Sequence, residues 1–295
     1  MANVLPRDKQ TDIVAALTEG VSIRAAERLT GVHRDTIMRL GVRIGEGCAK
    51  LHGSLMRDLQ VNRIELDEIW GFVGKKQRRV TADDSDMVGD QYTFIALAGT
   101  AKAILTYRVG KRTAETTRAF VDDLRERVIG SPEISADGFT AYPWAVANAF
   151  GEQCQFGVIE KRYSAPTAPE AARRYSPGVV VGVAKNAVIG APAHISTSYV
   201  ERQNLTLRMS QRRFTRLTNG FSKNFVNHCA AVALYVMHYN FCRVHEALRV
   251  TPAMALGITD HIWTIGELVD AALEPENAVA MRRVGRFGVV EGGKR

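Results

Sequence analysis

Hydrophobic side chains recur with helical spacing near the start of the chain, over residues 8–46. Three short helices are predicted there. Ser22 is placed to cap the second helix, and Gly31 can supply the left-handed residue of a tight turn before the third. Two short helices joined across such a turn are typical of a helix-turn-helix. A small three-helix unit without a role in DNA binding is the alternative interpretation, because short motifs are permissive.

The last helix of a helix-turn-helix enters the major groove of DNA, and its first residues face the base edges. The side chains expected to contact DNA from that helix are Arg34, Asp35, Thr36 and Arg39. A helix-turn-helix domain is therefore predicted over residues 1–50, followed by a linker at 51–60.

The middle of the chain alternates between strand-like and helix-like patterns. Strands are predicted at residues 63–70, 92–98, 103–109, 133–136 and 155–159, and helices at 113–128 and 140–150. A hairpin signal joins the second and third strands, and helices alternate with strands after it. This order predicts an α/β fold, in which flanking helices cover a mixed sheet.

The second half of the chain changes character twice. Residues 160–197 are basic, contain several prolines and are predicted to form an insertion with one short strand at 179–183. Helices are predicted at 198–217 and 221–244. The domain that follows the linker is expected to span 61–250, and 251–295 to hold a C-terminal helix and a flexible tail rich in Gly and Arg.

Composition narrows the class of partner. The chain has 295 residues, of which 46% are hydrophobic and 24% charged, and its net charge is +8. A globular mixture with this basic balance suggests a polyanionic partner such as nucleic acid, although a merely basic enzyme has the same composition. The four cysteines form no C-x-x-C pair, which argues against a zinc knuckle and a disulfide framework.

Neither a secretory leader nor a membrane span is expected. Charged residues, among them Asp8, Lys9, Asp12 and Arg24, interrupt residues 1–25. No apolar run approaches the ~20 residues that a membrane helix needs. The sequence therefore predicts a cytoplasmic protein without a membrane partner.

Three acidic residues are the candidates for chemistry, namely Asp67, Asp137 and Glu201. Asp67 lies between Glu65 and Glu68 in an otherwise apolar strand, and acids there are costly unless they bind something. Asp67 is preferred because the middle of the strand is best shielded. Asp137 follows a short predicted strand, where α/β sheets place their ligands, but an ordinary strand-ending turn explains it equally well.

Glu201, near the start of a predicted helix, also has a simpler explanation. Ser198 and Glu201 have the spacing of a capping box, in which the glutamate closes the first helical turn. Arg208 lies two turns further along the same helical face, and a carboxylate aligned with a guanidinium suits a metal ion beside a phosphate backbone. Three carboxylates that meet would repel one another, so they make sense mainly as ligands of a hard divalent cation such as Mg²⁺.

The stretch from residue 202 to 245 contains no Asp or Glu, whereas basic residues are frequent in it. A solvated helix surface normally mixes both signs, so a single-signed stretch with interspersed aromatic residues suggests contact with nucleic acid. The basic residues expected to contact DNA are Arg202, Arg208, Arg212, Arg213, Arg216 and Lys223.

With these residues in view, the chain resembles the DDE transposases of bacterial insertion sequences, and most closely the family named after insertion sequence one. The matching segments are residues 65–76, 136–142, 199–208 and 213–224. The resemblance covers residues 60–250, and its long motifs are more specific than three isolated acids. Some members of the family carry a cysteine-based zinc finger near the N-terminus, for which this chain has only Cys48.

The resemblance implies an RNase H-like catalytic core of the retroviral integrase superfamily, in which Asp67, Asp137 and Glu201 bind Mg²⁺ or Mn²⁺, as a pair of ions. It implies a contact of Arg208 with a phosphate or a DNA end. The implied activity is cleavage of double-stranded DNA at the ends of an insertion sequence and transfer of the freed strand to a target, by a dimer or larger homo-oligomer. A structure-selective nuclease on the same fold and a non-catalytic DNA-binding repressor derived from a transposase remain alternatives.

Overall fold

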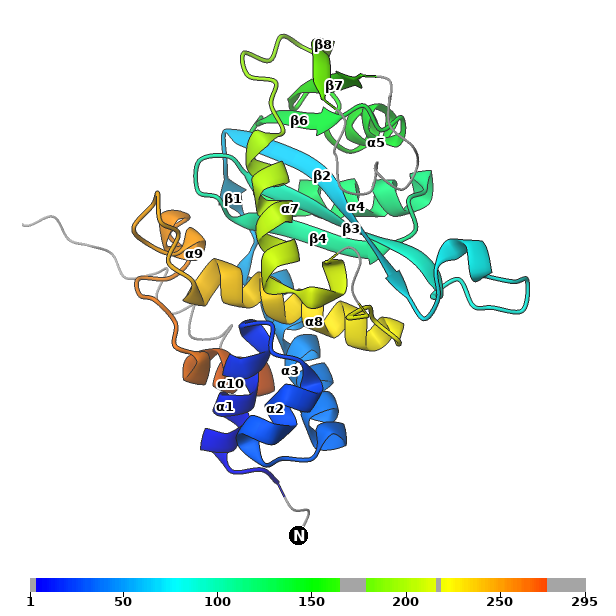
Figure 1. Cartoon of the computed structure of the whole chain (residues 1–295). Helices are drawn as coiled ribbons and strands as arrows, with labels where there is room; N and C mark the ends of the chain where they lie inside the picture. Colours follow the sequence, from blue (N-terminus) through cyan, green and yellow to red (C-terminus); the bar gives the residue numbers. More distant parts are fainter. Residues whose placement is uncertain (1–3, 165–178, 216–218, 275–295) are drawn as a thin grey trace, which may run out of the picture. The chain divides into compact units, whose positions relative to one another are not determined.

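The computed structural model describes residues 4–164, 179–215 and 219–274 of an α/β protein (Figure 1). In these residues six strands form one mixed sheet, in the order β4-β3-β2-β6-β7-β8. The strands are β2 (Arg63–Val73), β3 (Gly89–Ala98), β4 (Ile104–Gly110), β6 (Glu133–Asp137), β7 (Gln155–Tyr163) and β8 (Val180–Ile189). A separate parallel pair joins β1 (Leu59–Gln60) to β5 (Val128–Ile129). The predicted mixed sheet with flanking helices is therefore confirmed.

Three neighbouring strands of the sheet run parallel and carry its centre. Strand β6 lies between β2 and β7, parallel to both, and β8 returns antiparallel to β7. Leu66 and Ile69 of β2 are fully buried, and they point to opposite faces of the sheet. Buried side chains on both faces are expected of a strand that is covered on both sides.

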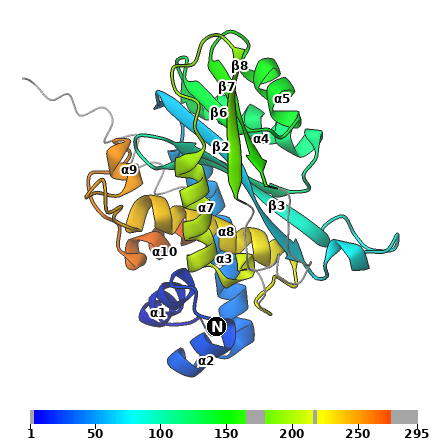
Figure 2. The same ribbon diagram turned by 45° about the horizontal axis from the view of Figure 1, so that its top comes forward.

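Helices lie on both faces of this sheet. Helices α4 (Ala114–Arg127) and α5 (Ala141–Phe150) lie on one face, and the first turns of α7 (Ser198–Ser210) lie on the other (Figures 1 and 2). Phe120 of α4 packs against Phe94 of β3, with 5.6 Å between the ring centroids. On the α7 face, Val200 is fully buried.

Packing divides the chain into two compact units. The first consists of Met1–Arg57, Trp70–Tyr92 and Leu205–Arg295, and the second of Asp58–Ile69 and Thr93–Asn204. Strands β2 and β3 and helix α7 contribute residues to both units. These boundaries differ from the expected domains at 1–50, 61–250 and 251–295, because segments distant in sequence pack together.

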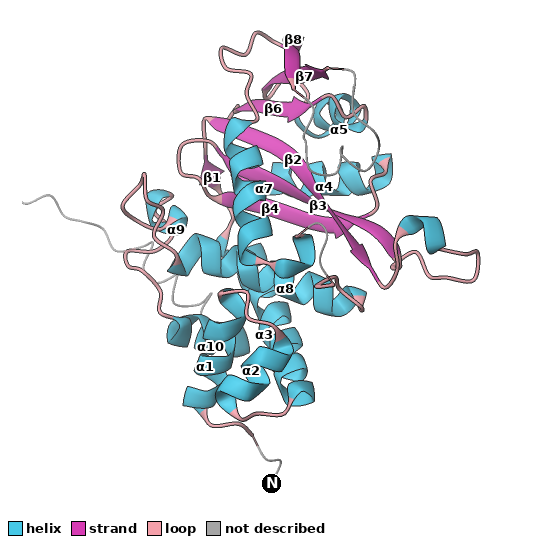
Figure 3. Ribbon diagram, viewed as in Figure 1, coloured by secondary structure: helices cyan, strands magenta, loops and turns pink. Residues whose placement is uncertain are grey.

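The first unit is mainly helical (Figure 3). It contains α1 (Arg7–Thr18), α2 (Ile23–Thr30), α3 (Arg34–Leu55), α8 (Phe225–Met237), α9 (Pro252–Ala255) and α10 (Ile265–Leu273). It also contains the short turns Gln77–Arg79 and Arg212–Phe214 and a π-helical turn at His238–Cys242. Helix α2 ends at Gly31, whose φ of +70° is the left-handed conformation that glycine adopts without strain.

Helix α3 is longer than expected and occupies half of the predicted linker at 51–60. It continues to Leu55 because its apolar positions, among them Leu51, are buried by other helices of the unit. A Cβ atom at Gly45 would collide with the backbone of Ala230 in α8, and one at Gly47 with that of Ala272 in α10. These glycines therefore permit a close approach of helices and do not end the helix.

The remaining boundary differences lie late in the chain. Strand β8 runs for ten residues, where a strand of five was expected at 179–183. Helix α7 ends at Ser210, earlier than the predicted 217. Part of the predicted insertion (165–178) and the predicted C-terminal tail (275–295) lie outside the described residues. None of the described helices is long and apolar enough to cross a membrane.

Candidate functional site

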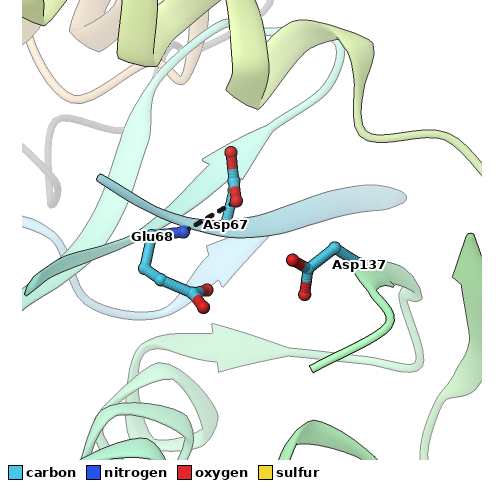
Figure 4. Close-up of side chains that lie close together, drawn as sticks. All are labelled: Asp67, Glu68 and Asp137. Carbon is cyan, nitrogen blue, oxygen red and sulfur yellow. Dashed lines mark hydrogen bonds between the residues drawn. The ribbon is translucent and has the colours of Figure 1, made fainter. Parts of the chain in front are cut away.

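Two of the predicted acids come together on adjacent parallel strands, where the pairing of β2 with β6 ends. Leu66 of β2 pairs with Ala136 of β6, so Asp67 and Asp137 follow this pair at the same level of the sheet. Glu68 joins them, and each of these three side chains has a carboxylate oxygen within 4.8 Å of those of the other two. Figure 4 shows Asp67 and Glu68 leaving β2 in different directions, with the carboxylate of Asp137 turned toward them.

Asp67 is held by two nitrogen donors. The side-chain amide of Asn204 donates to its Oδ2 at 2.8 Å, and the backbone N–H of Glu68 donates to its Oδ1 at 2.9 Å (Figure 4). Burial raises the pKa of Asp67 to about 7, and the charges of Glu68 and Asp137 add to that effect. The charged form of Asp67 is thus energetically unfavourable in the folded protein, as expected for a carboxylate whose charge a bound cation would balance.

Glu68 is a member of the cluster that the sequence did not single out. Its side chain is only 3% exposed, and it forms an ion pair with Arg112 and accepts a hydrogen bond of 2.9 Å from the hydroxyl of Tyr142. Burial raises its pKa, as does the charge of Asp137, while Arg112 opposes them. The preference for Asp67 over its neighbours assumed that only one acid of this strand would be functional. The presence of three acids within four positions of the strand was the sequence signal that could have identified Glu68.

Arg112 links two members of the cluster. Besides its ion pair with Glu68, its Nη2 lies 3.7 Å from Oδ2 of Asp137, and its guanidinium lies 4.0 Å from the ring centre of Phe139. It lies in the turn between β4, which ends at Gly110, and α4, which begins at Ala114, so this turn places it at the site. A positive charge at this position partly offsets the repulsion among the acids.

Glu201 lines the same cavity but stands apart from the cluster. The cavity has a volume of about 590 Å³ in the described residues and includes Asp67, Asp137 and Glu201 in its lining. Among those residues Glu201 does not belong to the group of carboxylates within 4.8 Å. It pairs with Lys161 of β7 and accepts a hydrogen bond of 2.6 Å from the hydroxyl of Thr197.

The capping-box explanation of Glu201 does not describe its contacts. Ser198 is the first residue of α7, not the residue before it, and its N–H donates to the hydroxyl of Ser196 at 3.2 Å. Glu201 is bonded instead to Thr197 and Lys161, and its side chain is 43% exposed. Its carboxylate therefore remains accessible from the cavity.

The donor set fits a hard divalent cation. Carboxylate oxygens are the ligands that Mg²⁺ and Mn²⁺ prefer, and Asp67, Glu68 and Asp137 supply them within one small volume. Arg112 pairs with Glu68 of this set, and Lys161 pairs with Glu201 in the same cavity. A divalent ion would have to compete with both cations for the carboxylates.

The residues expected to contact DNA differ in exposure. In α3, Arg34, Asp35 and Arg39 are exposed and Thr36 is half-buried. Of the later basic residues, Arg202, Arg212 and Lys223 are exposed, Arg208 is half-buried and Arg216 lies outside the described residues.

Arg213 differs from the other basic residues because its guanidinium points inward. It donates to the hydroxyl of Ser222 at 3.0 Å and to the carbonyl of Asn227 at 3.2 Å, and burial lowers its pKa to about 10. Arg213, expected to contact DNA, thus has hydrogen-bond partners within the first unit. Of the aromatic residues interspersed with the basic ones, Phe214 is buried, and the half-buried Phe221 stacks on Phe72 with 4.7 Å between the ring centroids.

Comparison with known proteins adds little to this geometry. No protein-family model matches the chain, and no curated protein is similar to it. A solved structure that resembles it is the cryo-EM structure of the piggyBac transposase synaptic complex with hairpin DNA. The TM-score is 0.39 at 10% sequence identity, with 97% of this chain and 73% of that chain covered. A likeness this weak carries no argument about activity, which is left to the chemistry of the cavity.

Proposed function

We propose that this protein is a DDE-type transposase that cuts double-stranded DNA at the ends of an insertion sequence and transfers the freed strands to a target. The observation that carries the proposal is one cavity lined by Asp67, Asp137 and Glu201, where the pairing of β2 with β6 ends. The extended sequence resemblance around these three residues supports the same assignment. The proposal includes an RNase H-like topology for the sheet and its flanking helices.

In this proposal Asp67, Asp137 and Glu201 bind Mg²⁺ or Mn²⁺, as a pair of ions, and Glu68 adds a fourth carboxylate. Bound ions would activate the attacking oxygen and stabilise the leaving oxygen of phosphodiester transfer. Asp67 must lose its proton before it can bind a cation, and the bond from Asn204 favours that charged form.

Two basic side chains that line the cavity, Lys161 and Arg112, also have a role in this proposal. Lys161 pairs with Glu201, and Arg112 with Glu68. If these carboxylates held divalent ions, Lys161 and Arg112 would be available to contact the negative charge of a DNA phosphate in the same cavity. Their ion pairs keep both side chains in the lining of that cavity.

DNA recognition is assigned to the helical first unit. Residues 1–50 would act as a helix-turn-helix that reads the terminal repeats of the element, through Arg34, Asp35, Thr36 and Arg39 at the start of α3. The exposed Arg202, Arg212 and Lys223, with Arg208, would contact backbone phosphates. Joining two ends requires two active sites, so a dimer or larger assembly on DNA belongs to the proposal.

A strand-transfer assay tests this function. The purified protein is incubated with Mg²⁺, a duplex that carries one end of the flanking element and a target plasmid. Wild type should give joined products, whereas Asp67→Asn and Glu201→Gln should give none and still bind the duplex. Asp122→Asn is the matched control, because this acid of α4 pairs with Arg118 across one helical turn and is not among the described residues that line the cavity.

Each other outcome of this assay has a definite meaning. Cleavage without joining would replace the proposal by a structure-selective nuclease. Specific binding without any metal-dependent chemistry would replace it by a DNA-binding repressor. Joined products from Asp67→Asn at the wild-type rate would remove the acids of the cavity from the mechanism.

A further inference from the structure

A second pair of polar side chains lies on the same strands as the acids of the cavity, each two residues earlier. Glu65 precedes Asp67 on β2, and Ser135 precedes Asp137 on β6. Glu65 and Ser135 are direct partners in the parallel pairing of these strands. Because side chains two residues apart on a strand share a face, the pair lies beside the acids along the strand direction.

Glu65 holds the beginning of α7. Its Oε2 accepts hydrogen bonds from the backbone N–H groups of Tyr199 and Val200, at 2.8 and 2.9 Å. These are among the N–H groups that a helix leaves unpaired in its first turn, where a negative charge is also favourable. The cap comes from a strand more than 130 residues earlier in the chain, so it fixes the position of α7 on β2 as well as its first turn.

Ser135 holds the segment that leads into α7. Its hydroxyl donates to the carbonyl of His194 at 3.2 Å and accepts from the N–H of Ser196 at 3.3 Å. Glu65 is 5% and Ser135 4% exposed, so both contacts are shielded from water. Two buried polar groups on adjacent strands therefore anchor residues 194–200 immediately before Glu201.

We propose that Glu65 and Ser135 are positioning residues that set the carboxylate of Glu201 against Asp67 and Asp137, and that neither binds the metal itself. This inference rests on the proposed function, in which these three acids act together. The oxygen of Glu65 that faces α7 is occupied by two backbone amides, and Glu65 lies outside the carboxylate cluster of the described residues. A helix cap with a merely local role would come from the residue before the helix, as Thr264 does for α10.

The test uses the full chain and two readouts that do not require activity. One is the affinity for Mn²⁺ by calorimetry, and the other is amide hydrogen exchange at Tyr199 and Val200. Glu65→Ala should weaken Mn²⁺ binding about tenfold or more, as loss of an outer-shell contact does at metal sites, and should speed exchange at both amides. Glu65→Gln, which retains one oxygen acceptor, should recover most of both properties.

Thr264→Ala is the control for loss of a helix cap, because it removes the cap of α10. It should change neither the Mn²⁺ affinity nor exchange at Tyr199. If Glu65→Ala does not fold, the test uses Ser135→Ala and Glu65→Gln instead. Ser135→Ala should then weaken Mn²⁺ binding and speed hydrogen exchange of the Ser196 amide.

The positioning role is overturned if Glu65→Ala, or Ser135→Ala in its place, binds Mn²⁺ as wild type does while Asp67→Asn does not bind. The proposed function fails separately, if wild type itself binds no Mn²⁺ and joins no DNA. Exchange at Tyr199 and Val200 still reports on the anchoring of α7 in that case, and unchanged exchange in Glu65→Ala would overturn the anchoring as well.

Discussion

The side-chain amide of Asn204 donates a hydrogen bond to Asp67, with 2.8 Å between Nδ2 and Oδ2. Asn204 follows Glu201 by three residues on α7, so the two side chains are neighbours on one helical face. This bond therefore joins the helix that carries Glu201 to the strand that carries Asp67. It also fixes the orientation of a carboxylate that is proposed to bind metal.

Replacing Asn204 by alanine should weaken Mn²⁺ binding and strand transfer about tenfold, because an oriented ligand loses its outer-shell partner. Calorimetry and the strand-transfer assay measure the two effects. Leu205→Ala is a suitable control, since the neighbouring Leu205 is 46% exposed. Wild-type Mn²⁺ affinity in Asn204→Ala would show that Asp67 needs no such support.

Asp67→Asn should have opposite effects on stability with and without divalent metal. The pKa of Asp67 is raised to about 7 in the folded protein, whereas it is near 4 in the unfolded chain. The charged side chain therefore destabilises the folded protein, by an amount that grows as the pH rises above about 4 and is constant above about pH 7. In EDTA at pH 8 the variant should be more stable than wild type, by roughly 2–4 kcal/mol at most. In saturating Mg²⁺ only wild type gains binding energy, which should reduce or reverse the difference.

Thermal unfolding of both proteins in EDTA and in Mg²⁺, at pH 4.5 and pH 8, measures this effect. Without metal the advantage of the variant should shrink toward pH 4.5, because the carboxyl of Asp67 is then protonated in the folded wild type. A variant less stable than wild type in EDTA at pH 8 would contradict the unfavourable charge at Asp67.

Arg112→Gln should strengthen Mn²⁺ binding and destabilise the metal-free protein. Arg112 pairs with Glu68 and lies 3.7 Å from Asp137, so it competes with a metal ion for both acids and offsets their repulsion when metal is absent. Calorimetry and unfolding in EDTA test the two directions. Arg118→Gln serves as control, because Arg118 forms an exposed pair with Asp122 and lies over the ring of Trp144, 5.8 Å from its centre. Weaker Mn²⁺ binding in Arg112→Gln would indicate that Arg112 orients the acids instead of competing for them.

The order of strands and helices in the second unit could be predicted from sequence because each element has its own hydrophobic period. For the same reason the sequence placed Asp67 within a strand and Asp137 at the end of one, as the structure does. The contacts of Glu68 with Arg112 and Tyr142, and of Lys161 with Glu201, join elements far apart in the chain. Local periodicity carries no information about such partners, which depend on how the strands pair and where helices pack.

Glycine explains why the end of α3 was misjudged. Gly45 and Gly47 lower intrinsic helix propensity, and the sequence predicts a linker at 51–60, soon after them. In the structure the missing side chains allow Ala230 and Ala272 to approach the helix closely, so packing outweighs propensity. Arg213 illustrates the same limit for charge, since a run of basic residues does not tell which member points inward.

Arg212 and Arg213 should respond differently to replacement by alanine. Arg213→Ala removes donors from two internal acceptors and should lower the free energy of unfolding by about 1–3 kcal/mol. Arg212 is exposed, so Arg212→Ala should change stability by less than about 0.5 kcal/mol. If Arg212 contacts a phosphate, its removal should weaken DNA binding at all sequences and reduce the salt slope by about 1.

Urea unfolding and DNA-binding titrations at several salt concentrations separate the two residues. The assignment of Arg213 to the interior fails if Arg213→Ala is as stable as wild type and loses DNA affinity as Arg212→Ala does.

His228 should make the protein less stable as the pH falls below the ordinary range of histidine. Its ring is fully buried, its Nδ1 lies 2.7 Å from the hydroxyl of Ser222, and burial, aided by the charge of Arg213, lowers its pKa to about 3. In the unfolded chain His228 takes up a proton near pH 6.5, whereas in the folded protein its ring stays neutral down to about pH 3. This contribution to stability is therefore complete above pH 6.5 and is lost between pH 6.5 and 3, at up to about 1.4 kcal/mol per pH unit.

His228→Gln removes this titration, so its free energy of unfolding should fall less steeply with pH than that of wild type. Urea unfolding of both proteins at pH 7, 6, 5 and 4 measures the difference. The stability of wild type relative to the variant should decrease at each step below pH 6.5, because protonation of the unfolded histidine penalises wild type alone. Parallel pH profiles would mean that the folded protein accepts the proton on His228, and that the ring is less enclosed than its burial against Phe214 indicates.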